Sequence, residues 1–264
     1  MPEKGVREIP VTKISSQGQR QELLDLVAVE SPLTIFLNGR EFITLLCSPE
    51  NPEYLAVGFL RSEGLIGEKE DLVSVHWDPE EGHVNVRTRK ADGLAEKLYG
   101  KRTLTSGCGK GTIFFNVLDS LKSRPLTQEV PVTAAELTRL VRLLQVRGEA
   151  FKETGGVHSA ALCSREGILL FSEDIGRHNA VDKIVGQALL EGIPLEDKLL
   201  VTSGRISSEI LLKAGKLKIA LIASRSAPTS LSVELAEKLG ITLVGFLRGG
   251  RMNLYAHGWR LEHG

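Results

Sequence analysis

Apolar positions first gather over the stretch PLTIFLNGREFITLLCSPENPEYLAVGFLRSEGLI, after about twenty polar residues that carry no periodic pattern. Within it, the pair Asn38-Gly39 separates two apolar runs, and this pair is typical of a two-residue hairpin turn. The later segments LVSVHWD and HVNVRTR alternate polar and apolar residues on either side of residues 79–82. We therefore predict two β-hairpins in the first third of the chain.

A helix is expected between the two hairpins. Leu55, Phe59 and Leu60 recur at helical spacing, and Gly64 supplies a stop signal. Ser48-Pro49 is the expected start, because serine caps helices and proline is tolerated in their first turn. The N-terminal part is therefore predicted to be an α+β unit.

A second unit is expected after residues 121–131, which carry two prolines between patterned regions and are the best linker candidate. Thr133 and Glu136 have the spacing of a capping box, and the apolar stripe that follows predicts a helix to about Phe151. We place an N-terminal α+β domain, including a glycine-rich cysteine loop and the linker, at residues 1–128. An α/β domain follows at residues 129–264.

The apolar runs GGVHSAALC and GILLFSED predict a buried hairpin, and NAVDKIVGQALLEG predicts a helix. From there, nearly continuous apolar strands alternate with amphipathic helices to residue 250. This order is typical of a mostly parallel sheet covered by helices on both faces. The predicted fold class is therefore α/β.

Composition restricts the partners. The chain has 264 residues, with 33 basic and 33 acidic side chains and a formal net charge of zero, so no global field attracts nucleic acid or an anionic membrane. No apolar run approaches the roughly 18 residues that a membrane span needs. Its three cysteines form no C-x-x-C pair, which favours a reducing compartment. We expect a cytoplasmic protein that binds neither nucleic acid nor membrane.

Arginines gather at the ends of three predicted strands, in TSGR, SRSAPTS and RGGR. Ligands of parallel α/β sheets bind beyond the carboxyl ends of the strands. Four arginines at one edge of a neutral chain favour a phosphate or pyrophosphate ligand, although pairing with surface carboxylates is the alternative. The four are Arg205, Arg225, Arg248 and Arg251.

The segment EDIGRHNAVDK adds side chains that could act in binding or catalysis at the start of a predicted helix. Asp174 or Asn179 alone is also explained as a helix cap, and a lone histidine as a packed residue. Taken together they favour a functional edge, and we include His178 among the expected ligand-binding residues. The capable side chains are Glu173, Asp174, Arg177, His178, Asn179 and Asp182.

One cysteine differs from the other two. Cys47 and Cys163 lie in core-like apolar runs, where cysteine is a common small apolar residue. Cys108 lies in LTSGCGKGT, whose glycines permit backbone freedom and whose basic neighbours favour a thiolate. An ordinary glycine-rich turn is the alternative. A Walker A phosphate loop is excluded, because Leu104 and Gly111 occupy two of its required positions.

Several long segments resemble the formate dehydrogenase accessory sulfurtransferases. They include EYLAVGFLRSEGLI, TSGCGKG, EDIGRHNAVDKIVG, TSGRISSEI and SRSAPTSLSVELAEKLGITLVGFLRGGRMNLY, and they span most of the chain. The resemblance implies a sulfur carrier that takes persulfide sulfur from a cysteine desulfurase. It passes this sulfur to the molybdenum or tungsten bis-pterin guanine dinucleotide cofactor of formate dehydrogenase. A homodimer and a larger domain similar in fold to cytidine deaminases are also implied.

The same resemblance assigns residues. The persulfide cysteine of the family falls on Cys108, and its dinucleotide-binding stretch falls on Phe246, Leu247, Arg248, Gly249, Gly250 and Arg251. Many members carry a second cysteine three positions after the first, where this chain has Gly111. A relay between two thiols would be impaired here, whereas a single-cysteine persulfide mechanism would not.

Two alternatives follow from the sequence. A zinc-dependent nucleotide deaminase would need the motifs H-x-E and P-C-x-x-C, and neither is present. Two positions after both His158 and His178 the chain has alanine instead of the required glutamate. A non-catalytic cofactor chaperone would use the same arginine-rich edge without moving sulfur. Only Cys108 and its loop favour the sulfur carrier over the chaperone.

Overall fold

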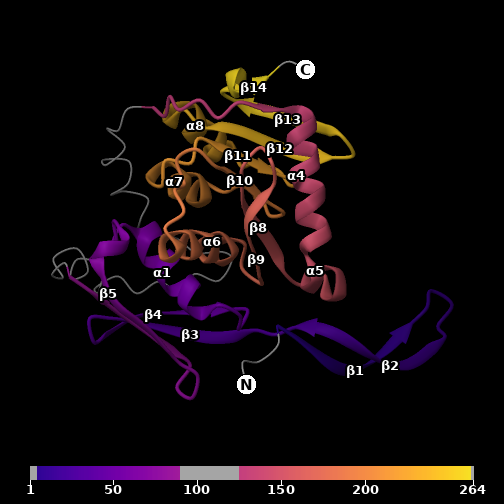
Figure 1. Cartoon of the computed structure of the whole chain (residues 1–264). Helices are drawn as coiled ribbons and strands as arrows, with labels where there is room; N and C mark the ends of the chain where they lie inside the picture. Colours follow the sequence, from indigo (N-terminus) through magenta and orange to yellow (C-terminus); the bar gives the residue numbers. More distant parts are fainter. Residues whose placement is uncertain (1–4, 90–124, 263–264) are drawn as a thin grey trace.

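The computed structural model describes residues 5–89 and 125–262 (Figure 1). The chain begins with an antiparallel two-stranded ribbon, formed by β1 (Val6–Ile14) and β2 (Arg20–Ala28), which extends away from the rest of the molecule. The sequence predicted no element for this polar stretch. Both faces of the ribbon are largely exposed, so neither strand has the alternation of apolar and polar residues that marks a half-buried strand.

Both predicted hairpins are confirmed within one four-stranded sheet of order β4-β3-β6-β5. Asn38 and Gly39 adopt left-handed backbone angles, with φ of 53° and 81°, as the tight turn requires. The two hairpins join through a parallel pairing of β3 with β6, and a short 3-10 turn, η1 (Lys69–Asp71), precedes β5. The strands are β3 (Ser31–Leu37), β4 (Arg40–Cys47), β5 (Leu72–Asp78) and β6 (His83–Thr88).

The helix between the hairpins, α1 (Pro52–Glu63), ends at Gly64 as predicted, with φ of 85° at that residue. It begins later than Ser48-Pro49, because Asn51 is the cap residue and Pro52 opens the first turn. Ser48 instead bonds to the second half of the chain: its N–H donates to Asp174 Oδ2 over 3.1 Å and its Oγ accepts from Ile175 N–H over 3.1 Å. Helix α1 packs its apolar side on the four-stranded sheet.

The second half of the chain is built on a six-stranded sheet. Strands β10, β11 and β12 pair in parallel, whereas β8, β9 and β13 pair antiparallel with their neighbours. The sheet is therefore mixed rather than mostly parallel, because the β8–β9 hairpin pairs antiparallel with β10 at one margin and β13 pairs antiparallel with β12 at the other. In spatial order the strands are β13 (Arg251–Ala256), β12 (Thr242–Arg248), β11 (Leu221–Ser224), β10 (Leu199–Thr202), β8 (His158–Cys163) and β9 (Ile168–Asp174).

Helices cover both faces of this sheet, which makes the fold class α/β as predicted (Figure 1). The capping box of Thr133 and Glu136 is present, but Gly148 divides the expected helix into two. One face carries α4 (Ala134–Arg147) and α5 (Glu149–Thr154). The other carries α6 (Arg177–Glu191), α7 (Ser208–Lys216) and α8 (Ser230–Leu239).

The described part of the expected linker, residues 125–131, has no regular secondary structure but is held firmly. Arg260, only 1% exposed, donates to the carbonyls of Leu126 and Gln128 over 2.9 and 2.8 Å. Arg260 is the last residue of η2 (Gly258–Arg260) and precedes β14 (Leu261–Glu262), which pairs with β7 (Val132–Thr133). The boundary between domains 1–128 and 129–264 stays a prediction, because residues 90–124 lie outside the described part.

The two halves meet where α1 crosses α6. Gly58 and Gly186 bring the two backbones into contact, since a Cβ on Gly58 would lie 1.7 Å from the carbonyl oxygen of Asp182. The absence of side chains at the crossing permits this approach. Among the helices of the described residues, none is both long and apolar enough to span a membrane.

Candidate functional site

The strand ends meet at one edge of the six-stranded sheet and bring two of the predicted arginines together. Thr202 and Ser224 pair in register at the ends of β10 and β11, and Arg225 N–H donates to the Thr202 carbonyl over 3.3 Å. Arg248, at the end of β12, donates from Nε to the carbonyl oxygen of Arg225 over 2.8 Å. The predicted convergence is thus confirmed for Arg225 and Arg248.

Arg251 joins this pair through a two-residue turn. Gly249 and Gly250 have φ of 55° and 76°, so the chain reverses sharply and Arg251 pairs with Arg248 across the turn. Residues other than glycine adopt such backbone angles only at an energetic cost. No heavy atom beyond the neighbouring residues lies within 4 Å of a Cβ built at either position. The turn therefore presents open backbone between two arginines.

The alternative explanation, in which these arginines form ion pairs with surface carboxylates, does not hold among the described residues. No Asp or Glu oxygen there lies within 4.0 Å of Arg205, Arg225, Arg248 or Arg251, although eight other ion pairs are present. Among the described residues, no carboxylate neutralises these four charges.

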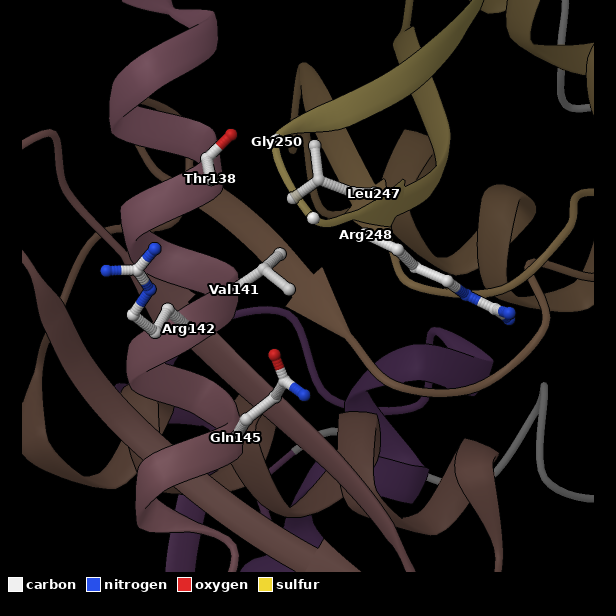
Figure 2. Close-up of a pocket in the computed structure, with 8 residues that line it drawn as sticks. Thr138, Val141, Arg142, Gln145, Leu247, Arg248 and Gly250 are labelled. Atoms are coloured by element: carbon white, nitrogen blue, oxygen red, sulfur yellow. The ribbon is translucent and has the colours of Figure 1, made fainter.

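A hollow of about 220 Å³ lies between α4 and the β12–β13 turn (Figure 2). Helix α4 contributes side chains two turns apart, and the strand end and turn contribute the opposite wall. Sequence reasoning missed the contribution of Thr138, Arg142 and Gln145, because polar residues outside the buried apolar stripe of an amphipathic helix are ordinarily solvated. The lining residues are Thr138, Val141, Arg142, Gln145, Leu247, Arg248, Gly249 and Gly250.

Gln145 connects this hollow to the strand ends. When its amide oxygen faces Arg225, it accepts from Nη1 over 3.0 Å and from Nη2 over 3.2 Å, whereas the reverse orientation would oppose donors to donors. Hydrogen-bond partners are the basis on which amide orientation is assigned. The guanidinium of Arg225 is thus held by the helix rather than extended into solvent.

Phe246 and Leu247 take different roles in the predicted dinucleotide stretch. Phe246 has φ of 51°, its side chain is 41% exposed, and its ring centroid lies 5.9 Å from the Arg248 guanidinium carbon. Leu247 is buried in the core beneath α4 and contributes only the floor of the hollow. Phe246 is therefore the residue whose side chain is presented at the surface.

Arg205 belongs to a second group at the same edge. Gly204, which precedes it, packs against α6, since a Cβ there would lie 2.9 Å from Arg177 Cβ and 3.4 Å from His158 Nδ1. Burial, and then the charges of Arg177 and Arg205, lower the pKa of His158 below its usual value. This group is thus electropositive, and it lies on the α6 side of the sheet.

His178 is turned toward the start of α7. Its Nε2 lies 2.9 Å from Ser207 Oγ and 3.2 Å from Glu209 Oε2. Burial, and then the charges of Lys213 and Arg177, lower the pKa of His178 to about 3, despite the nearby Glu209 carboxylate. The imidazole is therefore neutral at pH 7. Its role in ligand binding stays a prediction.

Other polar residues near His178, among them the predicted Asp174 and Asn179, join the two halves of the molecule. Lys183 Nζ lies 2.7 Å from Asp174 Oδ2 and donates to the Ser48 carbonyl over 3.0 Å, with both charged side chains at most 1% exposed. Asn179 donates to Asp174 Oδ1 and to the Leu46 carbonyl, over 2.9 Å in each case. We interpret these residues as structural, because their polar atoms are engaged within the joint.

The two cysteines in the described part of the chain lie in the core, as predicted. Cys47 and Cys163 are buried, and burial raises the pKa of each thiol to about 12. Neither is a nucleophile at neutral pH. Cys108 lies outside the described residues, and so does Gly111. Within the ranges 5–89 and 125–262, no group of three or more His, Cys, Asp and Glu side chains could hold a metal ion.

Known proteins resemble this chain over nearly its full length. A profile of the FdhD/NarQ family matches residues 28–262. The chain is 43% identical over 246 residues to "Sulfur carrier protein FdhD" of Bacillus subtilis (strain 168), covering 93% of this chain and 94% of the relative. It is 45% identical over 241 residues to the protein of the same name from Listeria monocytogenes serotype 4b (strain F2365), covering 90% and 92%.

A solved structure is similar in fold as well. The crystal structure of a formate dehydrogenase accessory protein from Desulfotalea psychrophila superposes with a TM-score of 0.80 at 28% sequence identity. The similarity covers 97% of this chain and 99% of that one. The arrangement of both halves is therefore shared.

Proposed function

This chain belongs to the FdhD/NarQ family, and from that premise we propose that it is a sulfur carrier acting in the maturation of formate dehydrogenase. The family membership confirms the resemblance seen in the sequence. The names of its relatives support the carrier role and the client enzyme. We further propose that the protein acts as a sulfurtransferase through a persulfide on Cys108.

In the proposed step, the Cys108 thiolate attacks the outer sulfur of a persulfide on a cysteine desulfurase. A new S–S bond forms at Cys108 while the S–S bond of the donor breaks, and the donor cysteine leaves as a thiolate. Sulfane sulfur moves without net oxidation or reduction. Cys108 is the candidate by contrast with Cys47 and Cys163, whose buried thiols have pKa values of about 12.

The proposed cargo is the molybdenum or tungsten bis-pterin guanine dinucleotide cofactor, bound as a substrate at the strand-end edge. The observation that carries this proposal is the set of four arginines without carboxylate partners among the described residues. Arginine binds pyrophosphate oxygens through two parallel hydrogen bonds. The open Gly249–Gly250 backbone between Arg248 and Arg251 allows close approach of a phosphate.

Complementation tests this function. A formate dehydrogenase would be produced in cells that lack their own sulfur carrier, together with the unaltered chain, Cys108→Ala or Cys47→Ala. We expect activity with the unaltered chain and with Cys47→Ala, and none with Cys108→Ala. Full activity with Cys108→Ala would instead favour the non-catalytic cofactor chaperone, which uses the same arginine-rich edge. We also propose a cytoplasmic homodimer, on the family resemblance alone.

A further inference from the structure

The β1–β2 ribbon exposes apolar side chains to solvent. Residues alternate between its two faces, and residues that pair across the strands share a face. One of them, the Leu24 face, carries the central pair of Pro10 and Leu24, with Ile14 and Leu26 on either side. Leu24 is 62% exposed and Ile14 is 59% exposed. Since an isolated two-stranded ribbon is only marginally stable in water, this face is suited to being covered by a partner.

The ribbon is fixed at its base and projects from there as an arm (Figure 1). At the base, Val29 N–H donates to the Gly5 carbonyl over 2.9 Å, and β2 packs on α5. Just after α5, a Cβ on Gly156 would lie 3.1 Å from the Cβ of Ala28. The nine residues of each strand span about 30 Å. An arm of this length can reach the surface of another molecule.

The charges of the arm favour an apolar partner surface without net charge. Its two strands carry three basic and three acidic side chains, so the arm has no net field to attract nucleic acid or an anionic membrane. Pro10, at the centre of β1, has no amide hydrogen, so the outer edge of β1 is poorly suited to strand addition. Packing through the Leu24 face is the mode that remains. The charged residues are Arg7, Lys13, Arg20, Glu8, Glu22 and Asp25.

A matching apolar surface lies beside the base of the arm. Helices α4 and α5 expose three large apolar side chains, and Val146 is the most exposed of them at 62%. This α4–α5 surface, formed by Leu143, Val146 and Phe151, adjoins the arm because β2 packs on α5. A two-fold axis beside this point would place the arm of each copy on the α4–α5 surface of the other.

The buried area distinguishes two ways of joining two copies. One face of the ribbon covers roughly 300 Å², given a length of about 30 Å and two strands about 4.8 Å apart. Two ribbons packed face to face would bury only roughly 600 Å² in total, which is less than the roughly 1,200–2,000 Å² of stable interfaces. Two reciprocal arms, each on the body of the other copy, would bury roughly 1,200 Å² and reach this range. The area therefore favours reciprocal arms.

We propose that the β1–β2 ribbon is an arm that packs its Leu24 face on the α4–α5 surface of a second copy, which returns its own arm in the same way. The inference rests on the homodimer of the proposed function, and it assigns the contact that the family resemblance leaves open. Helix α4 also lines the hollow at the β12–β13 turn. Each arm would therefore lie on a helix that borders the ligand-binding edge of the other copy.

Sedimentation velocity of the full-length chain over a series of concentrations tests this inference. We expect the unaltered chain to sediment as a dimer. Leu24→Asp on the arm and Val146→Asp on the receiving surface should each raise the dissociation constant of the dimer by about tenfold or more. Each substitution removes an apolar contact and would bury a carboxylate without a partner.

The matched control is Val73→Asp, which places the same charge at an exposed apolar position of β5, outside both surfaces. It should dimerise like the unaltered chain, and circular dichroism would verify that all three variants are folded. An unchanged dissociation constant in folded Leu24→Asp or Val146→Asp would overturn the inference while leaving the proposed homodimer intact. A chain that is monomeric at every concentration would overturn the inference together with the homodimer, but not the proposed sulfur transfer.

Discussion

Gly58 of α1 and Gly186 of α6 face each other where the two halves of the molecule cross, each against the backbone of the other helix. A Cβ on Gly58 would lie 1.7 Å from the Asp182 carbonyl oxygen, and one on Gly186 would lie 1.9 Å from the Tyr54 carbonyl oxygen. Both obstacles are backbone atoms of helices, which cannot move aside as a flexible side chain can. The crossing therefore fixes how the N-terminal sheet sits on the α/β half.

We predict that Gly58→Ala lowers the free energy of unfolding by about 3 kcal/mol or more, since overpacking against backbone must separate the helices. Urea denaturation followed by circular dichroism measures this change. Gly167→Ala is the matched control, because its backbone is not left-handed and nothing lies within 4 Å of the added Cβ. It should change stability by less than about 0.5 kcal/mol. Equal stability of the two variants would refute the close crossing.

The buried pair of Lys183 and Asp174 gives a second prediction. Lys183→Met should cost about 3–5 kcal/mol of unfolding free energy, because it leaves the Asp174 carboxylate buried without its cation. The double variant Lys183→Met with Asp174→Asn should regain part of that loss. The exposed pair of Lys218 and Glu196 provides the comparison, and Lys218→Met should cost less than about 1 kcal/mol. A similar loss of unfolding free energy in Lys183→Met and Lys218→Met would contradict the claim that the buried pair holds the two halves together.

His178 predicts how stability depends on pH. Its pKa in the folded state, about 3, lies below the ordinary value of 6.5. Between these values the unfolded chain binds a proton that the folded chain does not, so stability rises with pH across this window and falls as pH drops below 6.5. The slope from this residue is at most about 1.4 kcal/mol per pH unit. In His178→Gln, urea unfolding at pH 7.5, 6.5 and 5.5 should show a shallower decline; an unchanged decline would count against the neutral buried ring.

The arginines at the β12–β13 turn predict a salt-dependent nucleotide site. Arg248→Ala and Arg251→Ala should each weaken GDP binding by about tenfold or more, since a charge-assisted hydrogen bond contributes about 1.5–3 kcal/mol. Calorimetry at two salt concentrations should show a smaller salt effect in each variant. Arg20→Ala, on the exposed ribbon, is the control. Unchanged affinity in both turn variants would remove the ligand from this edge.

Local signals in the sequence predicted local structure well. Asn38-Gly39 forms the expected turn, and the capping box of Thr133 and Glu136 opens α4, because each depends on residues at most a few positions apart. The convergence of Arg225 and Arg248 was also predictable, since parallel strands end at a common edge.

Contacts between distant segments were not predictable in this way. Ser48 was expected to cap a helix, but it bonds to Asp174, which is 126 residues away. Gln145 carries no sequence signal, because an exposed glutamine on an amphipathic helix is ordinarily solvated. The β1–β2 ribbon was missed because it buries neither face.

The persulfide on Cys108 is the central claim, and intact mass spectrometry tests it most directly. The protein would be incubated with a cysteine desulfurase and cysteine, alongside Cys108→Ala and Cys47→Ala. We predict the added mass of one sulfur atom in the unaltered chain and in Cys47→Ala, removed by a reductant and absent from Cys108→Ala. No added sulfur in the unaltered chain, or equal addition to Cys108→Ala, would contradict the carrier role of Cys108.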